Sequence, residues 1–287
     1  MAERRTPSVR ARQLAAQLRR LREAATLTGE DVAAQLGWSP SKVSRVETGQ
    51  TAITPEDLES LLDLYSIPDS QRDQLIELGL NAQHRGWWDA YGDTFRPEVA
   101  ALTALEADAQ SMRWYHPTVL PGLLQTEQYA RAVLRSHLFM TPPARIERRV
   151  QARIAGQGIL FREDPPAPQV DVILDEAAIL RVIGGPAVQQ AQLTHLLKMC
   201  ERPNISVQIL PFSVGGHPAM TGGFTILRFP GSLEDVVYVE NMTSDLFVES
   251  ETDVYHYGLA FDHLRSLALG NEESLAFIAE ASAAMGQ

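Results

Sequence analysis

The chain has 287 residues, of which 45% are hydrophobic, and its formal net charge is −11. This length accommodates one small domain and one of ordinary size, each with a core. The first 30 residues have no apolar leader-like segment, and no stretch nears the ~18 apolar residues of a spanning helix. The single cysteine, Cys200, excludes an internal disulfide. We therefore expect a cytoplasmic protein without membrane contact.

Charge is unevenly distributed along the sequence. Residues 1–50 contain nine Lys or Arg and five Asp or Glu, a net charge of +4, which leaves −15 for the remainder. A nucleic-acid duplex attracts the surface that meets it, and charges more than roughly 10 Å away are screened. A basic amino-terminal module can therefore bind DNA although the whole chain is acidic.

The amino-terminal segment predicts five helices. In the first, apolar residues recur at helical spacing while arginines occupy the opposite face. Thr28, Ser39 and Thr54 are suited to cap three of the others, and Gly37 and Gly49 are suited to end two of them. The five expected helices, caps included, cover residues 9–25, 28–36, 39–49, 54–65 and 71–80.

Two of these helices form a helix-turn-helix pattern, in which the second presents Ser41, Lys42 and Arg45 outward while Val43 and Val46 face inward. A plain helical bundle is the alternative interpretation. A pair of Arg45 with Glu47 or with a nearby acid, which would simply hold the helix, is also open.

The run "LTGEDVAAQLGWSPSKVSRVETGQTAITPEDLESLLDLY" resembles the Cro/repressor-type helix-turn-helix family along its whole length. Gly29 departs from the family pattern, which often has a glutamine there that braces a phosphate contact, so we expect no side-chain role for it. The resemblance implies binding of double-stranded DNA. The candidate DNA-binding residues are Ser39, Ser41, Lys42, Ser44, Arg45, Gln50 and Thr51.

Beyond a boundary region at residues 80–96, the sequence predicts mixed helix and strand. A strand, a helix and a second strand favour a crossover connection and at least one parallel strand pair, to which "FTILRF" and "VVYVE" add a hairpin. The expected helices lie at residues 100–112, 124–134, 145–157, 193–199, 255–269 and 273–284, and the expected strands at 170–174, 205–211, 224–229 and 236–240.

The predicted fold class is therefore α+β. An all-α helix-turn-helix domain at residues 1–82 is followed by a junction at 83–98 and a mixed α/β domain at 99–287.

Three phrases in the carboxy-terminal part are distinctive: "PGLLQTEQYARAVL", "VILDEAAILRVIGGPAVQQAQLTHLL" and "PNISVQILPFSVGGHPAMTGGFTILRF". Together they resemble the carboxy-terminal domain of the actinobacterial Scr1-like antitoxin-type transcriptional regulators, where the domain follows a Cro/repressor-type helix-turn-helix. The resemblance implies a transcription factor, often encoded beside a small partner protein.

Candidate partner- or effector-binding residues lie in two places. Asp175 and Glu176 end a strand, where they are suited either to bind a cation or amine or to cap the next helix. His217 and Met220 lie in a glycine-rich stretch of fourteen residues between two apolar strands, which is suited either to bind an effector or to serve as a plain connection.

Aromatic residues near the domain junction form a further group. Trp87 and Trp88, with Trp114 and Tyr115 further on, are expected to pack between the two domains, and a ligand pocket is the other interpretation. The seven histidines include no pair at the H-E-x-x-H spacing, so neither a metal site nor a cofactor is expected.

These patterns predict a sequence-specific DNA-binding transcriptional regulator rather than an enzyme. We expect a homodimer formed through the carboxy-terminal segment, which binds a small partner protein or a small-molecule effector. Two alternatives remain open. The first is an antitoxin-like protein that neutralises a small partner and binds DNA for autoregulation, and the second is an enzyme fused to a targeting helix-turn-helix.

Overall fold

The structure is a computed structural model that describes residues 9–49, 51, 53–83, 90–91, 94–138, 140–230, 234–242 and 244–285. The chain divides into two compact units, Met1–Gly86 and Trp87–Gln287, which we call unit 1 and unit 2. The regular elements described in unit 1 are all helices, and unit 2 contains a six-stranded mixed sheet with helices, so the fold class is α+β as the sequence predicts.

Five helices make up the described part of unit 1. Helix α1 packs against α3 and α5, α4 packs against α5, and α2 packs against α3. Leu18, Val32 and Leu62 are fully buried at the centre. The helices are α1 (Val9–Ala24), α2 (Gly29–Leu36), α3 (Pro40–Glu47), α4 (Pro55–Leu64) and α5 (Asp69–Gln83).

Helix ends in unit 1 follow the predicted capping. Thr28 and Asp31 form a reciprocal capping box, and the side chains of Ser39 and Thr54 each accept a hydrogen bond from the backbone N–H three residues on. Gly37 ends α2 with a φ of 67°, a left-handed conformation that glycine adopts without steric cost. Local sequence alone thus determines where α2 and α3 begin and how they are joined.

The net charge of the whole of unit 1 differs from that of the first fifty residues. Residues 1–86 contain eleven basic and twelve acidic residues, a net charge of −1, which leaves −10 for residues 87–287. Basic residues are concentrated before residue 50, whereas α4 and α5 are acidic. The charge asymmetry that favours DNA therefore lies within unit 1.

Unit 2 is built on one sheet with the strand order β3-β2-β1-β4-β5-β6. Strands β1, β2 and β3 are parallel, as the predicted crossover requires, and β4, β5 and β6 continue the sheet antiparallel. The strands are β1 (Ser111–His116), β2 (Gln169–Asp175), β3 (Ile205–Leu210), β4 (Phe224–Arg228), β5 (Val236–Glu240) and β6 (Asp245–Val248).

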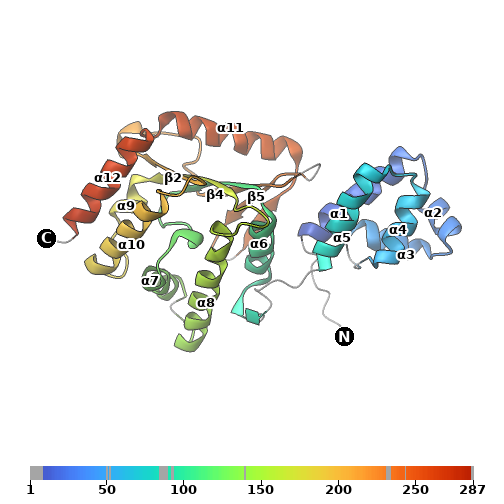
Figure 1. Cartoon of the computed structure of the whole chain (residues 1–287), viewed down its shortest axis with the longest axis horizontal. Coiled ribbons are helices and arrows are strands. Elements are labelled where there is room, and N and C mark those ends of the chain that lie inside the picture. Colours follow the sequence, from blue (N-terminus) through green and yellow to red (C-terminus); the bar gives the residue numbers. More distant parts are fainter. Residues whose placement is uncertain are drawn as a thin grey trace. The chain divides into compact units, whose positions relative to one another are not determined.

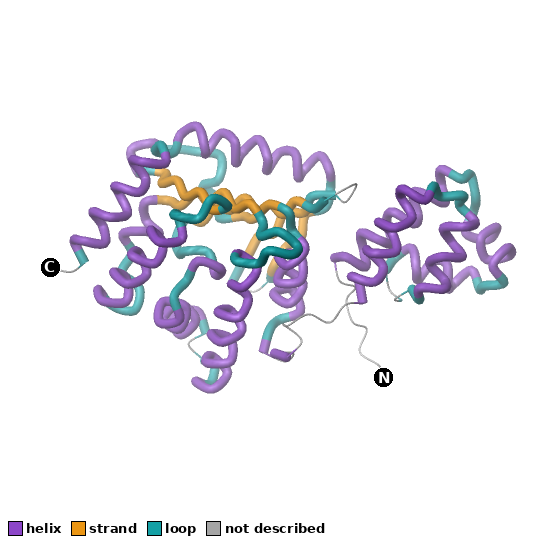
Figure 2. Tube along the Cα trace, viewed as in Figure 1, coloured by secondary structure: helices purple, strands orange, loops and turns teal. Residues whose placement is uncertain are grey.

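Helices cover both faces of this sheet. Figure 1 shows α11 lying along one face and α7 and α8 lying on the other, and Figure 2 shows the sheet in orange between these helical layers. Phe261 and Leu264 of α11 are fully buried against Tyr115, Ile173 and Val237 of the strands. The helices are α6 (Pro97–Asp108), α7 (Glu127–His137), α8 (Pro143–Gly156), α9 (Glu176–Leu180), α10 (Pro186–Met199), α11 (Glu251–Leu267) and α12 (Asn271–Ala284).

The phrase "PGLLQTEQYARAVL" forms a short 3-10 turn followed by α7, and buried glutamine amides hold it in place. The Gln192 side chain from α10 accepts from Thr126 N at 2.6 Å and donates to Leu124 O at 2.8 Å. The Gln125 side chain donates to Leu120 O and accepts from Arg153 of α8. Because these amides satisfy backbone groups that would otherwise be buried without partners, the phrase has a structural role.

Two predictions about unit 2 were wrong in part. The helix expected at residues 100–112 ends at Asp108, and Ser111 and Met112 begin β1. Trp114 and Tyr115, expected at a domain junction, lie in β1 with 2% and 1% of their surface exposed inside the core of unit 2. Strand β6 was not expected at all. Trp87 and Trp88 lie outside the described residues.

Candidate nucleic-acid interface

The helix-turn-helix of unit 1 consists of α2, a three-residue turn and α3. Val43 and Val46 anchor α3 in the core with 3% and 4% of their surface exposed. Helix α3 packs against both α1 and α2, which fixes its orientation within the unit. Gly29, the residue that departs from the family pattern, lies beside α3. A Cβ built on it would be 3.8 Å from Val43 Cγ1, which is an ordinary van der Waals contact.

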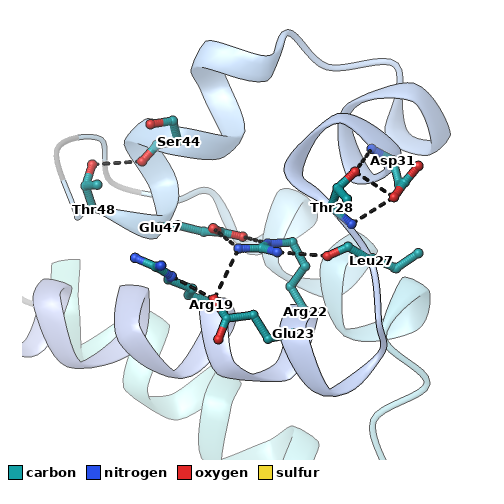
Figure 3. Close-up of polar contacts among 9 residues, drawn as sticks. All are labelled: Arg19, Arg22, Glu23, Leu27, Thr28, Asp31, Ser44, Glu47 and Thr48. Atoms are coloured by element: carbon teal, nitrogen blue, oxygen red, sulfur yellow. Dashed lines mark hydrogen bonds and ion pairs between the residues drawn. The ribbon is translucent and has the colours of Figure 1, made fainter.

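The outer face of α3 is a polar stripe. Ser41, Ser44, Arg45 and Thr48 are all exposed, and their spacing of three and four residues places them on one side of the helix, opposite the two valines. The Thr48 hydroxyl donates to the Ser44 carbonyl oxygen at 2.8 Å, as Figure 3 shows. The stripe thus offers three hydroxyls and one guanidinium to a partner.

Glu47 ends α3 and is held by Arg22 of α1. Arg22 Nε lies 2.7 Å from Glu47 Oε1, Arg22 Nη2 lies 3.0 Å from Oε2, and Arg22 Nη1 donates to Leu27 O at 2.8 Å (Figure 3). Hydrogen bonding to Glu47 raises the pKa of the Arg22 guanidinium. The pair of Arg45 with Glu47, considered from the sequence, is therefore replaced by one between α1 and α3.

Lys42 is engaged by two neighbours. Its Nζ lies 2.7 Å from Asp57 Oδ2 of α4 and 3.9 Å from the centre of the Trp38 ring. Lys42 retains 33% side-chain exposure, so the ammonium remains accessible at the edge of the α3 stripe. Among the described residues, no ion pair is formed by the Arg45 side chain, whereas Arg19, Arg22 and Lys42 each pair with a carboxylate.

The amino-terminal ends of α2 and α3 differ in charge. The first turn of α2 contains Glu30 and Asp31, whereas the first turn of α3 contains no acidic residue. Backbone N–H groups and the helix dipole favour an anion at a helix amino terminus. The start of α3, with the Ser39 and Ser41 hydroxyls 3.0 Å apart, is therefore the end better suited to a phosphate.

The structure brings six of the seven candidate DNA-binding residues together on or beside α3. Lys42 is partly exposed, and the other five are exposed: Ser39, Ser41, Ser44, Arg45 and Thr51. Gln50 lies outside the described residues. Sequence analysis missed Thr48, although its place seven residues after Ser41 was a readable signal for the same helix face.

The two acidic candidates of unit 2 take structural roles. Asp175 Oδ1 accepts from Ala177 N at 2.9 Å, which confirms the capping interpretation for this residue. Glu176 Oε2 accepts from Phe212 N at 2.8 Å and so tethers the start of the glycine-rich stretch to α9.

The glycine-rich stretch is pinned to the sheet at its far end. His217 Nδ1 accepts from Ala219 N at 3.3 Å, and its Nε2 lies 3.4 Å from the Tyr115 hydroxyl. A Cβ on Gly223 would lie 2.7 Å from the Tyr115 carbonyl oxygen, which explains glycine at that position. Met220, between these points, is 71% exposed and is the candidate of this stretch most open to a partner.

Among the described residues, no group of three or more His, Cys, Asp or Glu side chains is arranged to hold a metal ion. Nor does any helix in this part of the chain combine the length and apolarity needed to cross a membrane.

Comparisons with known proteins agree with the division into units. Residues 13–75 match the family model described as "Helix-turn-helix domain", and residues 99–280 match the model described as "Domain of unknown function (DUF5753)". No curated protein and no solved structure gives a significant match.

Proposed function

Because the chain belongs to the protein family defined by the DUF5753 domain and has a helix-turn-helix domain ahead of it, we propose that it is a sequence-specific DNA-binding transcriptional regulator. The observation that carries the proposal is the exposed α3 stripe with Arg45 uncommitted to any described carboxylate. In helix-turn-helix proteins the second helix of the motif lies in the major groove and its side chains contact base edges.

In this proposal α3 is the reading helix. Arg45 reaches a guanine edge, and Ser41, Ser44 and Thr48 contact neighbouring bases through their hydroxyls. Ser39 and the first N–H groups of α3 hold a phosphate, and Lys42 contributes a second phosphate contact. Thr51 continues the surface beyond the end of the helix, and Gln50 is proposed from the sequence alone as a further DNA contact.

The test begins by selecting sequences from a random duplex pool with the full chain. Affinity for the selected operator is then measured for Arg45→Ala and for a matched control, Arg265→Ala, which removes an exposed charge from α11 of unit 2. Loss of a base contact by Arg45→Ala costs about 1–3 kcal/mol, and the control leaves affinity unchanged. Failure to enrich any sequence, or equal losses in both variants, would refute sequence-specific reading by α3.

We further propose that unit 2 binds a partner protein or an effector and that the regulator is a cytoplasmic homodimer. The resemblance to the actinobacterial Scr1-like antitoxin-type regulators supports a small partner encoded next to this chain. The net charge of −10 on unit 2 favours a basic partner by electrostatic steering. Met220 and His217 of the glycine-rich stretch are the residues proposed to meet it.

The adjacent gene product provides the test of this second proposal. Operator affinity of the full chain is measured with and without that product, for the wild type and for Met220→Glu. The partner should change affinity only in the wild type, because a coupled partner must bind the two states of the regulator unequally. An affinity that the product leaves unaltered would contradict it. The antitoxin-like alternative predicts a different result. If the adjacent gene product is toxic to cells, Arg45→Ala would then relieve this toxicity as fully as the wild type does.

A further inference from the structure

The two edges of the unit 2 sheet differ in how they are finished. At the β3 edge, Leu269 N donates to Ile209 O at 2.9 Å and Ile209 N donates to Ser274 Oγ at 3.0 Å. The Gln208 side chain adds a bond to Leu269 O at 2.8 Å. The segment between α11 and α12, with the first turn of α12, thus closes this edge.

The β6 edge has no such closure in the part of the chain that the structure describes, where β5 alone pairs with β6. Unpaired strand edges present rows of N–H and C=O groups that readily pair with another strand. One edge of the sheet is therefore sealed and the other is open.

Neighbouring side chains hold β6 in its extended form. Both Asp245 oxygens accept from Arg96 Nη2, at 2.9 and 3.1 Å, and the Asp245 side chain is fully buried. The Phe247 ring packs 5.2 Å from that of Tyr238 in β5. Leu246, between them, is 54% exposed, and Met242 in the preceding turn is 90% exposed. The open strand is thus pre-ordered and displays apolar surface.

We propose that β6 pairs antiparallel with β6 of a second copy of this chain, about a two-fold axis that passes beside Leu246. A strand that pairs with its own copy closes a dimer and leaves neither edge free. The choice of a second copy rests on the proposed function, because helix-turn-helix domains read two-fold related half-sites as dimers.

Charge selects the register of this pairing. When the two sheets join into one, directly opposed residues have their side chains on the same side of the sheet. Side chains alternate between the two sides along a strand, so the two-fold axis must pass beside a residue and not between two residues. Centred on Phe247, the pairing places Asp245 opposite Glu249, acid against acid. Centred on Leu246, it places Leu246 against its own copy, Asp245 opposite Phe247 and Ser244 opposite Val248, so that no two acids face each other.

A cysteine at position 246 tests this register. Directly opposed residues of antiparallel strands have Cα atoms about 4.5–5.5 Å apart, within the range that a disulfide spans. In a Cys200→Ser background, Leu246→Cys should convert to a covalent dimer under mild oxidation. Val182→Cys, at a residue 47% exposed beyond α9, is the matched control and should stay monomeric on a denaturing gel. Equal cross-linking of both variants, or none at position 246, overturns the proposal.

A charge at the same position tests the interface without chemistry. Leu246→Lys places two like charges at the axis, and the dimer should dissociate at a concentration at least about tenfold higher than wild type. Because Leu246 is exposed in the single chain, the variant should fold normally, and its thermal unfolding should match that of the wild type at dilutions where both proteins are monomers. A monomer in the wild type at every concentration, or a dimer that Leu246→Lys leaves intact, overturns the proposal. Both experiments are done without DNA, so failure of DNA binding would be seen separately.

Discussion

Arg22 of α1 and Glu47 of α3 form a two-point ion pair in which 2.7 and 3.0 Å separate the paired nitrogen and oxygen atoms. The two side chains are only 13% and 10% exposed. Since Glu47 is the last residue of α3, the pair fixes the end of the proposed reading helix to the first helix of the unit.

Breaking this pair is expected to loosen α3. Glu47→Gln leaves the Arg22 charge largely buried without its counter-charge, so we expect a loss of about 1–3 kcal/mol in the free energy of unfolding of unit 1. Hydrogen exchange of α3 peptides in the full chain measures it. The matched control is Arg19→Gln, which breaks the exposed pair with Glu23 and should change stability little. Similar effects from both variants would show that α3 does not depend on the buried pair.

Asp57 is expected to weaken DNA binding by occupying Lys42. In Asp57→Asn the ammonium loses its carboxylate partner and is available to a phosphate, so operator affinity should rise and the salt dependence should steepen by about one counterion. Titrations at several salt concentrations measure both quantities. Asp63→Asn, which removes the same charge from an exposed partner of Arg72, is the control. An equal gain in the control would mean that net charge alone is responsible.

Ser39 allows stability and binding to be separated. Ser39→Ala removes the cap of α3 and should cost about 1 kcal/mol of stability, whereas Ser39→Asp retains a capping oxygen. The aspartate also adds a negative charge where a phosphate is proposed to bind. We therefore expect Ser39→Asp to unfold like the wild type and to bind the operator poorly. Normal binding by Ser39→Asp would exclude a phosphate at the start of α3.

Unit 2 should lose stability as the pH rises from 6.5 to 8 because of Glu106. Burial raises the pKa of Glu106 to about 8 from 4.5, against the opposing effect of Arg153, and burial lowers the pKa of His116 to about 4 from 6.5. The folded state therefore retains the Glu106 proton between pH 4.5 and 8 after the unfolded chain has lost it, so stability falls with rising pH. His116 makes stability rise with pH between pH 4 and 6.5, because there the unfolded chain binds the proton and the folded state does not. Above pH 6.5 it no longer opposes the effect of Glu106.

Urea unfolding at pH 6.5 and pH 8 measures this effect. Glu106→Gln should flatten the decline between these two values, and the exposed control Glu272→Gln should leave it unchanged. A decline that persists undiminished in Glu106→Gln would assign the pH dependence to other groups.

Features set by neighbouring residues could be predicted from the sequence. The caps at Thr28, Ser39 and Thr54 and the left-handed end at Gly37 depend on residues within one helical turn. The parallel pairing of β2 with β3 follows from a strand, a helix and a strand in succession.

Strand β1 escaped sequence analysis because it lies at the centre of the sheet. Met112, Trp114 and Tyr115 are all buried, so the alternation of polar and apolar residues that marks a half-exposed strand is weak. No glycine or proline separates it from α6, so the sequence gives no sign of where the helix ends. The four residues of β6 were too few to give any pattern.

The ion pairs at the candidate interface could not be predicted from the sequence for another reason. Lys42 meets Asp57 fifteen residues on, and Arg22 meets Glu47 twenty-five residues on. Neither spacing belongs to a regular helix, so only the tertiary arrangement of α1, α3 and α4 brings these charges together. Sequence could therefore nominate the residues of α3 but not which of them were already paired.

The closure of β3 by Leu269 and Ser274 also governs how the chain matures during synthesis. Ile209 leaves the ribosome more than sixty residues before Ser274, and during that interval the strand has no lateral partner on its outer side. Unit 1 is a compact unit by itself and can fold well before, since domains generally fold as units from the amino terminus. Translation thus yields a folded helix-turn-helix first, and an interruption before Ser274 leaves a nascent chain with a bare strand exposed to aggregation.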